Sequence, residues 1–300
     1  MSNDRLTIGL IGTGYWADRC HAAGIDQRDD LDFAGVWGRD AAKAAGLASG
    51  HQTVAFASAE ELFAAVDIVS FAVPPAIQAE LAPAAAAAGC HLLLEKPIAT
   101  TSAEANRIAD ACAENRVQSV VNFSLLWGGA TGPWLDEVVE PGNWDGGSAT
   151  ILGDLRVTDG PFSASPWRRA DNGALWDVGP HALSLLVAGL GPVVDVHGEH
   201  GRGDSFVLSA RHEQGGVSTT TLSYSLAAGS GTFRVEFWGA DGLTTPPPAL
   251  AGASPADNIA PALAALVTSI RANRPARYDA RFGAGIVDIL ARAEQSALTH

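Results

Sequence analysis

Lys96 is the first residue of this sequence whose type and position suggest chemistry. The 300-residue chain contains only two lysines, Lys43 and Lys96. Lys96 stands in Glu95-Lys96-Pro97, directly after the apolar run HLLL, where a buried strand would end. Open α/β sheets bind ligands at the carboxyl ends of their strands, and a compact ammonium group there can polarise a substrate oxygen. The alternative is a structural salt bridge between Glu95 and Lys96.

A second reactive pattern is Asp177-Val178-Gly179-Pro180-His181. It places a carboxylate four residues before an imidazole, around a helix start that Pro180 favours. Asp177 near the first helical turn would be favoured in its ionised form. A neutral histidine with a pKa of about 6.5 can accept an alcohol proton or return it. The alternative makes Asp177 a helix cap and His181 a core or interface residue.

A glycine turn near the N-terminus predicts a dinucleotide site. Gly12-Thr13-Gly14-Tyr15-Trp16-Ala17 follows the apolar strand LTIGLI and precedes an expected helix. The first glycine permits the tight turn, the second lets backbone amides approach a pyrophosphate, and Ala17 allows close helix packing. An ordinary turn between a strand and a helix is the alternative. The expected cofactor contacts are Gly12, Gly14, Tyr15, Trp16 and Ala17, together with Pro74, Glu95 and Lys96 near the ends of later strands.

The end of the second expected strand bears on the choice of cofactor. LDFAGVW is followed by Gly38-Arg39-Asp40. Gly38 would leave room for a 2′-phosphate and Arg39 would bind it by charge-assisted hydrogen bonds, so NADP is favoured. In the alternative, Asp40 holds the ribose hydroxyls of NAD while Arg39 stacks on adenine or is a solvated surface charge.

The elements that must position these residues form an α/β protein. Over the first 120 or so residues, short aliphatic runs alternate with alanine-rich helical stretches, which predicts a doubly wound parallel sheet. Segments at hairpin spacing then predict a mainly antiparallel open sheet. The strands are expected in LTIGLIG, LDFAGVWG, TVAF, DIVSFAVP, HLLLEKP, VQSVVNF, SATILGDLRV, VVDVHGEH, SFVLSARHE, VSTTTLSYSL and FRVEFWG.

Helices and a break are expected in addition. SAEELFAAV and TSAEANRIADACAEN open with capping residues, and a further helix should begin near Pro180. The prolines of TTPPPALAGASPAD exclude regular structure there, and two helical stretches follow it. We expect a dinucleotide-binding domain over residues 1–121 and a substrate-binding and oligomerisation domain over 122–300.

Composition excludes several classes of protein. The formal net charge is −14 and no basic run occurs, so nucleic acid is not expected as a partner. Three cysteines without metal-ligand spacing predict reduced thiols, with no zinc site and no disulfide framework. The sequence shows no export signal and no stretch suited to a membrane span, so we expect a cytoplasmic protein that does not associate with membranes.

These motifs together resemble the Gfo/Idh/MocA family, which comprises glucose-fructose oxidoreductases, inositol dehydrogenases and rhizopine-catabolism proteins. AVPPAIQAELAPAAAAAGCHLLLEKP and PWRRADNGALWDVGPHALSLL carry the resemblance beyond the glycine turn. It implies a Rossmann domain, and hydride transfer between NAD(P) and a sugar or polyol. Lys96 would contact the reacting hydroxyl, His181 would exchange its proton, and Asp177 would orient the substrate or the base. It also implies dimers or tetramers joined through the face of the antiparallel sheet.

The sequence departs from the family pattern around the expected pocket. Gln78 stands where members usually carry histidine, and Leu125, Leu126 and Trp127 replace an arginine and phenylalanine. Two alternative functions stay open: a non-catalytic dinucleotide-binding sensor, and a reductase of an unusual carbonyl, imine or tetrapyrrole in which His181 is structural. The substrate contacts expected besides Lys96, Asp177 and His181 are Asn122, Trp127, Trp167 and Arg168, with Trp16 and Trp176 as further pocket candidates.

Overall fold

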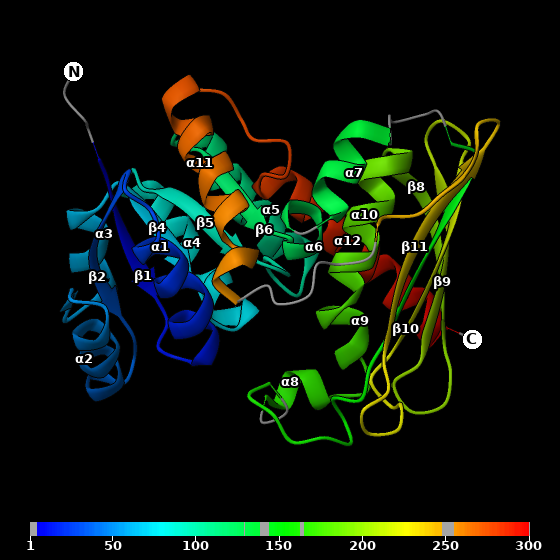
Figure 1. The fold of residues 1–300 in the computed structure, drawn as a ribbon, viewed down its shortest axis with the longest axis horizontal. Helices are drawn as coiled ribbons and strands as arrows, with labels where there is room; N and C mark the ends of the chain where they lie inside the picture. Colours follow the sequence, from blue (N-terminus) through cyan, green and yellow to red (C-terminus); the bar gives the residue numbers. More distant parts are fainter. Residues whose placement is uncertain (1–4, 129, 139–143, 163–164, 248–254, 300) are drawn as a thin grey trace. The chain divides into compact units, whose positions relative to one another are not determined.

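A computed structural model describes residues 5–128, 130–138, 144–162, 165–247 and 255–299 (Figure 1). The chain divides into two compact units. The first comprises residues 1–128 and 252–284, and the second comprises 129–251 and 285–300. The first unit therefore includes a segment that comes after residues 129–251 of the second unit in the sequence. This division differs from the sequence-based boundary at residue 122, and each unit is described below by itself.

The first unit is built on a six-stranded parallel sheet with the order β3-β2-β1-β4-β5-β6. Its strands β4, β5 and β6 are buried along almost their whole length, as expected when helices cover each side. The order reverses between β1 and β4, which makes their carboxyl edge the expected ligand crevice. The strands are β1 (Leu6–Ile11), β2 (Leu31–Trp37), β3 (Val54–Ala55), β4 (Ile68–Phe71), β5 (His91–Glu95) and β6 (Ser119–Asn122).

Helices cover both faces of this sheet. The π-helical segment η1 (Ala17–Ala22), α1 (Ala23–Asp26), α2 (Ala41–Gly50) and α11 (Ala260–Ala272) share one face. On the opposite face lie α3 (Ala59–Ala65), α4 (Pro75–Ala87) and α5 (Ser102–Glu114). The side chains of Ser58 and Thr101 cap α3 and α5 as the sequence predicts. Two short helices, α6 (Ser124–Trp127) and η2 (Pro255–Asn258), complete the unit.

The returning helix α11 closes the core of the first unit. Leu263 and Leu266 of α11 are fully buried against Ile8, Leu93 and Val120 of the sheet. The α11 sequence NIAPALAALVTSIRAN has the apolar spacing of a helix with one buried side, as its periodicity predicts. Helix α11 is therefore an integral part of the first unit.

The second unit contains a six-stranded mixed sheet with the order β12-β11-β7-β10-β9-β8. All its neighbouring pairs are antiparallel except β7 and β10, which run parallel. Burial alternates residue by residue along β9, so one face is covered and the other is open. The strands are β7 (Gly146–Leu152), β8 (Val193–His200), β9 (Phe206–His212), β10 (Val217–Ser223), β11 (Thr232–Gly239) and β12 (Gly242–Thr244).

Helix α10 (Gly179–Leu190) packs on this sheet and is almost entirely buried. It begins with Pro180 in its first turn, as predicted. The unit also contains α7 (Thr131–Val138), α8 (Pro166–Arg169), α9 (Gly173–Asp177) and the end of α12 (Ala280–Leu298). The α/β class with a parallel sheet and a mainly antiparallel one is confirmed.

One local prediction is wrong. The expected strand SATILGDLRV ends at Leu152, and the chain then turns because Val157 and Thr158 donate backbone hydrogen bonds to Asp154. The segment GALWD, for which no element was predicted, forms α9. The irregular segment TTPPPALAGASPAD includes residues 248–254, which lie outside the described residues, and ends in the 3₁₀ turn η2.

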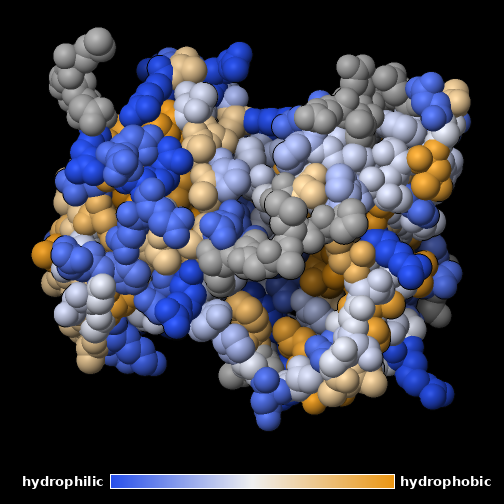
Figure 2. Space-filling model, in the orientation of Figure 1, coloured by the Kyte–Doolittle hydropathy of each residue, from blue (hydrophilic) through white to orange (hydrophobic). Residues whose placement is uncertain are grey.

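The visible face of the first unit carries many strongly hydrophilic residues, whereas that of the second is mainly of intermediate hydropathy, and both show scattered hydrophobic groups (Figure 2). Among the described helices, none combines the length and the apolar character that a membrane crossing requires. The three cysteines are buried and free. Within the described residues, no cluster of three or more potential metal ligands occurs.

His51 joins three helical segments of the first unit at a partly buried site. It follows α2, and its ring nitrogens hydrogen-bond to Asp26 of α1 and to Asp18 of η1, the latter at 2.9 Å. Burial lowers the pKa of His51, but the hydrogen bonds and charges of the two aspartates outweigh this and raise it. The folded state therefore holds the proton more tightly than the unfolded chain.

The hydrogen bonds from His51 to Asp26 and Asp18 should make the free energy of unfolding depend on pH. The stabilisation is complete below the ordinary histidine pKa of 6.5 and is lost as the pH rises through the raised value. His51→Gln should therefore lower the thermal midpoint more at about pH 6 than at about pH 9. Thermal unfolding followed by circular dichroism measures the difference, and an equal loss at both pH values would contradict the prediction.

Candidate functional site

Two neighbouring strands of the first unit end side by side and bring two polar residues together. In the parallel pair β5 and β6, Glu95 is in register with Asn122. Both are the last residues of their strands, and both are buried. Glu95 and Asn122 therefore lie at the carboxyl edge of the sheet, where the sequence analysis expected cofactor and substrate contacts.

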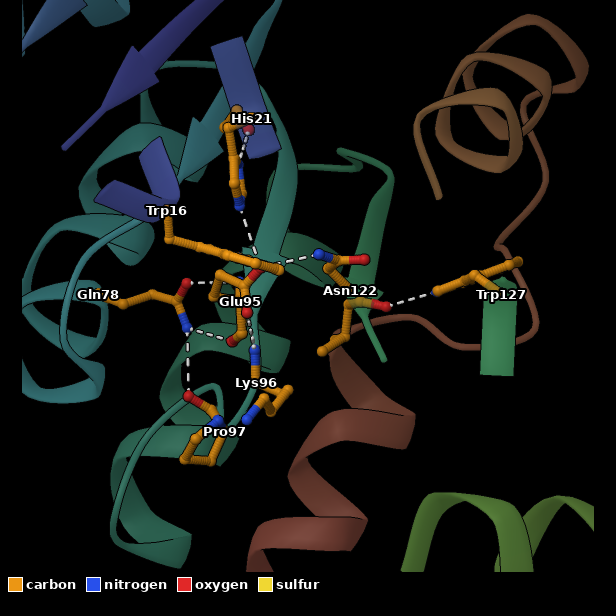
Figure 3. Close-up of polar contacts among 10 residues, drawn as sticks. Trp16, His21, Gln78, Glu95, Lys96, Pro97, Asn122 and Trp127 are labelled. Atoms are coloured by element: carbon orange, nitrogen blue, oxygen red, sulfur yellow. Dashed lines mark hydrogen bonds and ion pairs between the residues drawn. The ribbon is translucent and has the colours of Figure 1, made fainter. Parts of the chain in front are cut away.

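The Glu95 carboxylate lies at the centre of a group of N–H donors (Figure 3). Its Oε1 accepts hydrogen bonds from Trp16 Nε1 at 2.9 Å, His21 Nε2 at 3.0 Å and Asn122 Nδ2 at 2.8 Å. Its Oε2 accepts from the backbone N–H of Lys96 at 3.2 Å. One carboxylate thus connects the glycine turn, η1, β6 and the turn that carries Lys96.

These donors keep Glu95 charged inside the protein. Burial on its own raises the pKa of a carboxyl group, because the charged form loses its hydration. For Glu95, the hydrogen bond and charge of His21 and the N–H groups of Asn122 and Trp16 outweigh burial and lower the pKa below its ordinary value.

Gln78 fixes the backbone on both sides of Lys96. It is fully buried in α4, and its amide oxygen accepts from the Glu95 backbone N–H at 2.8 Å. Its amide nitrogen donates to the carbonyls of Glu95 at 2.8 Å and of Ile98 at 3.1 Å. The peptide bond between Lys96 and Pro97 is cis. Gln78, which stands where the family usually has histidine, therefore fixes the backbone of the Lys96 turn by hydrogen bonds (Figure 3).

The glycine turn has the local geometry that a pyrophosphate site requires. Gly12 has φ +129°, and a Cβ there would lie 2.4 Å from the carbonyl oxygen of Ala72. A Cβ on Gly14 would meet no atom within 4 Å, so open space adjoins its backbone. Ala17 is fully buried and Tyr15 is exposed. The turn therefore suits the approach of a diphosphate to backbone amides.

The packing at the end of β2 explains why residue 38 is a glycine, and the explanation differs from room for a 2′-phosphate. A Cβ on Gly38 would lie 2.6 Å from Cγ2 of Thr13, so the glycine allows this strand end to pack against the glycine turn. Arg39 is exposed. Asp40 caps α2: its Oδ1 accepts from the N–H groups of Ala42 and Lys43, both at 3.1 Å. Pro74 is the exposed residue that precedes α4.

In the second unit, Asp177 is buried and doubly hydrogen-bonded. Its Oδ2 accepts from Arg168 Nε at 2.9 Å and from the Tyr224 hydroxyl at 2.6 Å. Asp177 is the last residue of α9 and directly precedes Val178, the N-cap residue of α10. The guanidinium and the phenol both donate to its carboxylate. His181 lies one residue after Pro180 in the first turn of α10 and is half-buried.

The tryptophans proposed as substrate contacts have different surroundings. The guanidinium of Arg168 lies 4.4 Å from the ring centroid of Trp167, in a cation–π arrangement. Trp127 donates to the carbonyl of Val121 at 2.7 Å and packs edge-on against Tyr278. Trp176 is 4% exposed and donates to Glu294. Trp127 and Trp176 thus have structural partners, whereas Trp167 supports an arginine that binds Asp177.

Sequence reasoning missed His21, Ser70 and Tyr224. His21 lies four residues after Ala17, a helical spacing that turns it toward the sheet, and this spacing could have indicated it. Ser70 lies within a buried run and Tyr224 in a strand distant from Asp177 in sequence, so no local pattern points to them. Lys96 and Asn122 belong to the first unit with Glu95, and Asp177, His181, Trp167 and Arg168 belong to the second.

Residues 6–123 match the family described as an oxidoreductase family with an NAD-binding Rossmann fold. The fold and this match define the class of the first unit: a Rossmann unit of the type found in this oxidoreductase family. More particularly, residues 6–123 match the Gfo/Idh/MocA family, which bears out the resemblance inferred from the sequence.

The curated relatives match over the N-terminal part. UDP-N-acetylglucosamine 3-dehydrogenase of Acidithiobacillus ferrooxidans is 35% identical over 115 residues, which are 37% of this chain and 35% of that protein. D-glucoside 3-dehydrogenase of Escherichia coli is 32% identical over 114 residues, which are 37% of this chain and 32% of that protein. An uncharacterized oxidoreductase of Synechocystis is 31% identical over 40% of this chain and 33% of its own length. The match thus spans about a third of the length of these relatives.

Solved structures resemble the chain over nearly its full length. GenD2 from gentamicin A biosynthesis, in complex with NAD, has a TM-score of 0.83 at 20% identity and covers 98% of this chain and 95% of its own. Levoglucosan dehydrogenase, in complex with NADH and levoglucosan, has a TM-score of 0.83 at 18% identity, covering 98% and 97%. At these identities, the likeness establishes the fold.

The contact between Tyr224 and Asp177 should be measurable as stability. A hydrogen bond to a buried charge contributes about 1.5–3 kcal/mol, so Tyr224→Phe should lower the free energy of unfolding by that amount. In an Asp177→Ala background, the same substitution should cost much less, because the acceptor is gone. Urea unfolding of the four proteins measures this double-mutant cycle. Equal losses in both backgrounds would show that Tyr224 stabilises the protein through other contacts.

Proposed function

We propose that this protein is an oxidoreductase that transfers a hydride between NADP and a secondary alcohol or ketone of a sugar, a polyol or a related small molecule. The observation that carries the proposal is the set of hydrogen bonds to the buried Glu95 carboxylate. It joins the glycine turn, through Trp16, to the turn that carries Lys96. The dinucleotide turn and the backbone of the residue that bears the ammonium group are thus held together at the carboxyl edge of the sheet.

The residues of the chain divide the work in this proposal. The bound nicotinamide supplies the hydride acceptor or donor. Lys96 places its positive charge beside the substrate oxygen, where negative charge develops, and preorganised charge of this kind is usually a large catalytic contribution. His181 takes the hydroxyl proton during oxidation and returns it during reduction. Asp177, fixed by Arg168 and Tyr224, orients the substrate or the histidine.

The surroundings of Arg39 support NADP. Asp40 uses one carboxylate oxygen to cap α2, and the other lies 3.8 Å from the Lys43 ammonium. A capping carboxylate is less suited to holding two ribose hydroxyls, whereas the exposed Arg39 is available for a 2′-phosphate. The family description names NAD, and NAD remains the alternative cofactor. Gly12, Gly14, Tyr15, Trp16, Ala17, Gly38 and Pro74 are the further cofactor contacts in the proposal.

A sugar-like substrate is supported by the relatives' names and by local chemistry. Two of the curated relatives are named as 3-dehydrogenases of a sugar nucleotide and of glucosides. Trp167 and Arg168 offer an aromatic face and a guanidinium, which suit a hydroxylated ring. Asn122 has a buried amide oxygen without a hydrogen-bond partner, so it can accept from a bound molecule. Trp127, which has a structural partner, is the weaker of the proposed contacts.

Self-association through the open face of the second sheet completes the proposal. Val207 and Val217 are about half exposed there, at 48% and 52%. Their neighbours on that face include Ser209, Arg211 and Thr219, which pair across β9 and β10. We propose a homodimer or homotetramer with a partly polar interface on this face.

Lys96→Met tests the proposed chemistry. With NADP and a panel of sugars and polyols, turnover followed at 340 nm should fall by about 10²–10³ relative to wild type, because charge stabilisation is lost. Cofactor affinity, measured by fluorescence titration, should fall much less than turnover. His181→Ala should also lose turnover, and Lys43→Arg is the matched control. Tight NADP binding without turnover of any substrate in the wild type would favour a sensor instead, and a Lys96→Met variant with wild-type turnover would exclude the assigned role.

Arg39→Ala tests the choice of cofactor. Loss of charge-assisted hydrogen bonds worth about 1.5–3 kcal/mol should weaken NADP binding roughly tenfold to a hundredfold, with little effect on NAD. Isothermal titration with each dinucleotide measures the two affinities. An unchanged affinity for NADP, or an equal loss for both dinucleotides, would reject Arg39 as a 2′-phosphate ligand.

A further inference from the structure

We propose that His21 is a positioning residue for Lys96, which it reaches through the Glu95 carboxylate. No sequence motif indicates a role for His21. It lies on η1, outside the turn that carries Lys96. The kinetic consequence rests on the proposed role of Lys96 in turnover. The structural consequence does not, because it can be measured in the absence of any substrate.

His21 is held from both sides within the core. It is fully buried, and its Nε2 lies 3.0 Å from Glu95 Oε1 while its Nδ1 lies 2.8 Å from the Ser70 hydroxyl. Ser70 is also fully buried, on β4. The imidazole therefore bridges β4 and the end of the neighbouring strand β5, where it meets Glu95 (Figure 3).

The chemistry of Glu95 determines which nitrogen of His21 carries a proton. An ionised carboxylate can only accept hydrogen bonds, so Nε2 must be the donor toward Glu95. In a neutral imidazole, Nδ1 then accepts from the Ser70 hydroxyl, which selects this tautomer. In the charged imidazolium, Nδ1 donates to the same oxygen. Ser70 fits either state, and in both states His21 presents an N–H to Glu95.

The hydrogen bonds continue from Glu95 to the reactive turn. Glu95 Oε1 accepts from His21, and Oε2 of the same carboxylate accepts from the Lys96 backbone N–H at 3.2 Å. Because the carboxylate is planar, fixing Oε1 also fixes the direction of Oε2. Trp16 and Asn122 bind Oε1 as well, but only His21 combines full burial with a second hydrogen bond to a fully buried partner.

Loss of His21 would leave this carboxylate with one donor fewer in a buried place. A buried charge that loses a donor either rotates to find another or shifts toward protonation. Either response changes the acceptor seen by the Lys96 N–H and so the direction of the turn. Residues that orient a reactive group typically contribute about 10-fold to 100-fold to activity when their contact is removed.

The lysine content of the chain provides a direct readout. Selective ¹⁵N-lysine labelling gives two backbone amide signals, those of Lys43 and Lys96. Each amide donates to a carboxylate: Lys43 to Asp40 at 3.1 Å, and Lys96 to Glu95. In His21→Leu, the Lys96 cross-peak should move or broaden while the Lys43 cross-peak stays in place. His21→Gln, whose amide can donate from about the position of Nε2, should return the Lys96 cross-peak toward its wild-type position.

Kinetics provide the second readout. His21→Leu should lower kcat by about 10-fold to 100-fold with little change in KM, since the substrate contacts remain. His21→Gln should recover most of kcat. His91→Gln is the matched control, because His91 is at the opposite end of β5, where it accepts from the Gln118 backbone N–H. It should leave the Lys96 cross-peak and kcat unchanged.

The outcomes separate this inference from the proposed function. An unmoved Lys96 cross-peak in a folded His21→Leu protein, together with an unchanged kcat, would overturn the positioning role. So would a His21→Gln protein whose Lys96 cross-peak and kcat are displaced from wild type as far as those of His21→Leu. A moved cross-peak with full turnover, while Lys96→Met is inactive, would also overturn it. If the wild type turns over no substrate but the cross-peak moves in His21→Leu and returns in His21→Gln, the proposed function fails and the positioning of Lys96 by His21 stands.

Discussion

The buried negative charge of Glu95 is the constraint on which the first unit depends. An ionised carboxylate in a protein interior is costly unless several hydrogen bonds replace its lost hydration. Here the replacements come from four separate parts of the chain: the glycine turn, η1, the end of β6 and the Lys96 backbone. Each of these parts of the chain must lie where its N–H group can reach the carboxylate. The hydrogen bonds to one buried carboxylate therefore hold the glycine turn, η1, β6 and the Lys96 turn in position relative to one another.

The same principle operates independently in the second unit. Asp177 is buried and obtains its hydrogen bonds from Arg168 and Tyr224, with Trp167 beneath the guanidinium. Burial and the neighbouring Asp177 charge raise the pKa of Tyr224, so the phenol stays protonated and remains a donor. The acidic residue of each motif is thus fixed by neutral or cationic donors, and in the first unit the backbone N–H of Lys96 is one of them.

The sequence predicted the fold well because its patterns are local. Strand runs, caps and the glycine turn each depend on a few neighbouring residues, and they identify β1 to β6, α3, α5 and the start of α10. Long-range pairing was not predictable: nothing local shows that β7 and β10 run parallel or that α11 returns to the first sheet. The site shows the same limit. Glu95, Lys96 and Asp177 were found from motifs, whereas His21, Ser70 and Tyr224 acquire meaning only through tertiary contacts.

The return of α11 to the first unit has a consequence for biosynthesis. Leu263 and Leu266 fill the core beside Ile8, Leu93 and Val120, yet they leave the ribosome after residues 129–251. One apolar face of the first sheet therefore stays incompletely covered until residues 129–251 and α11 have been translated. During this interval, the nascent chain presents a hydrophobic surface of the kind that chaperones bind and that favours aggregation. Fragments cut at the end of β6 would retain that surface permanently.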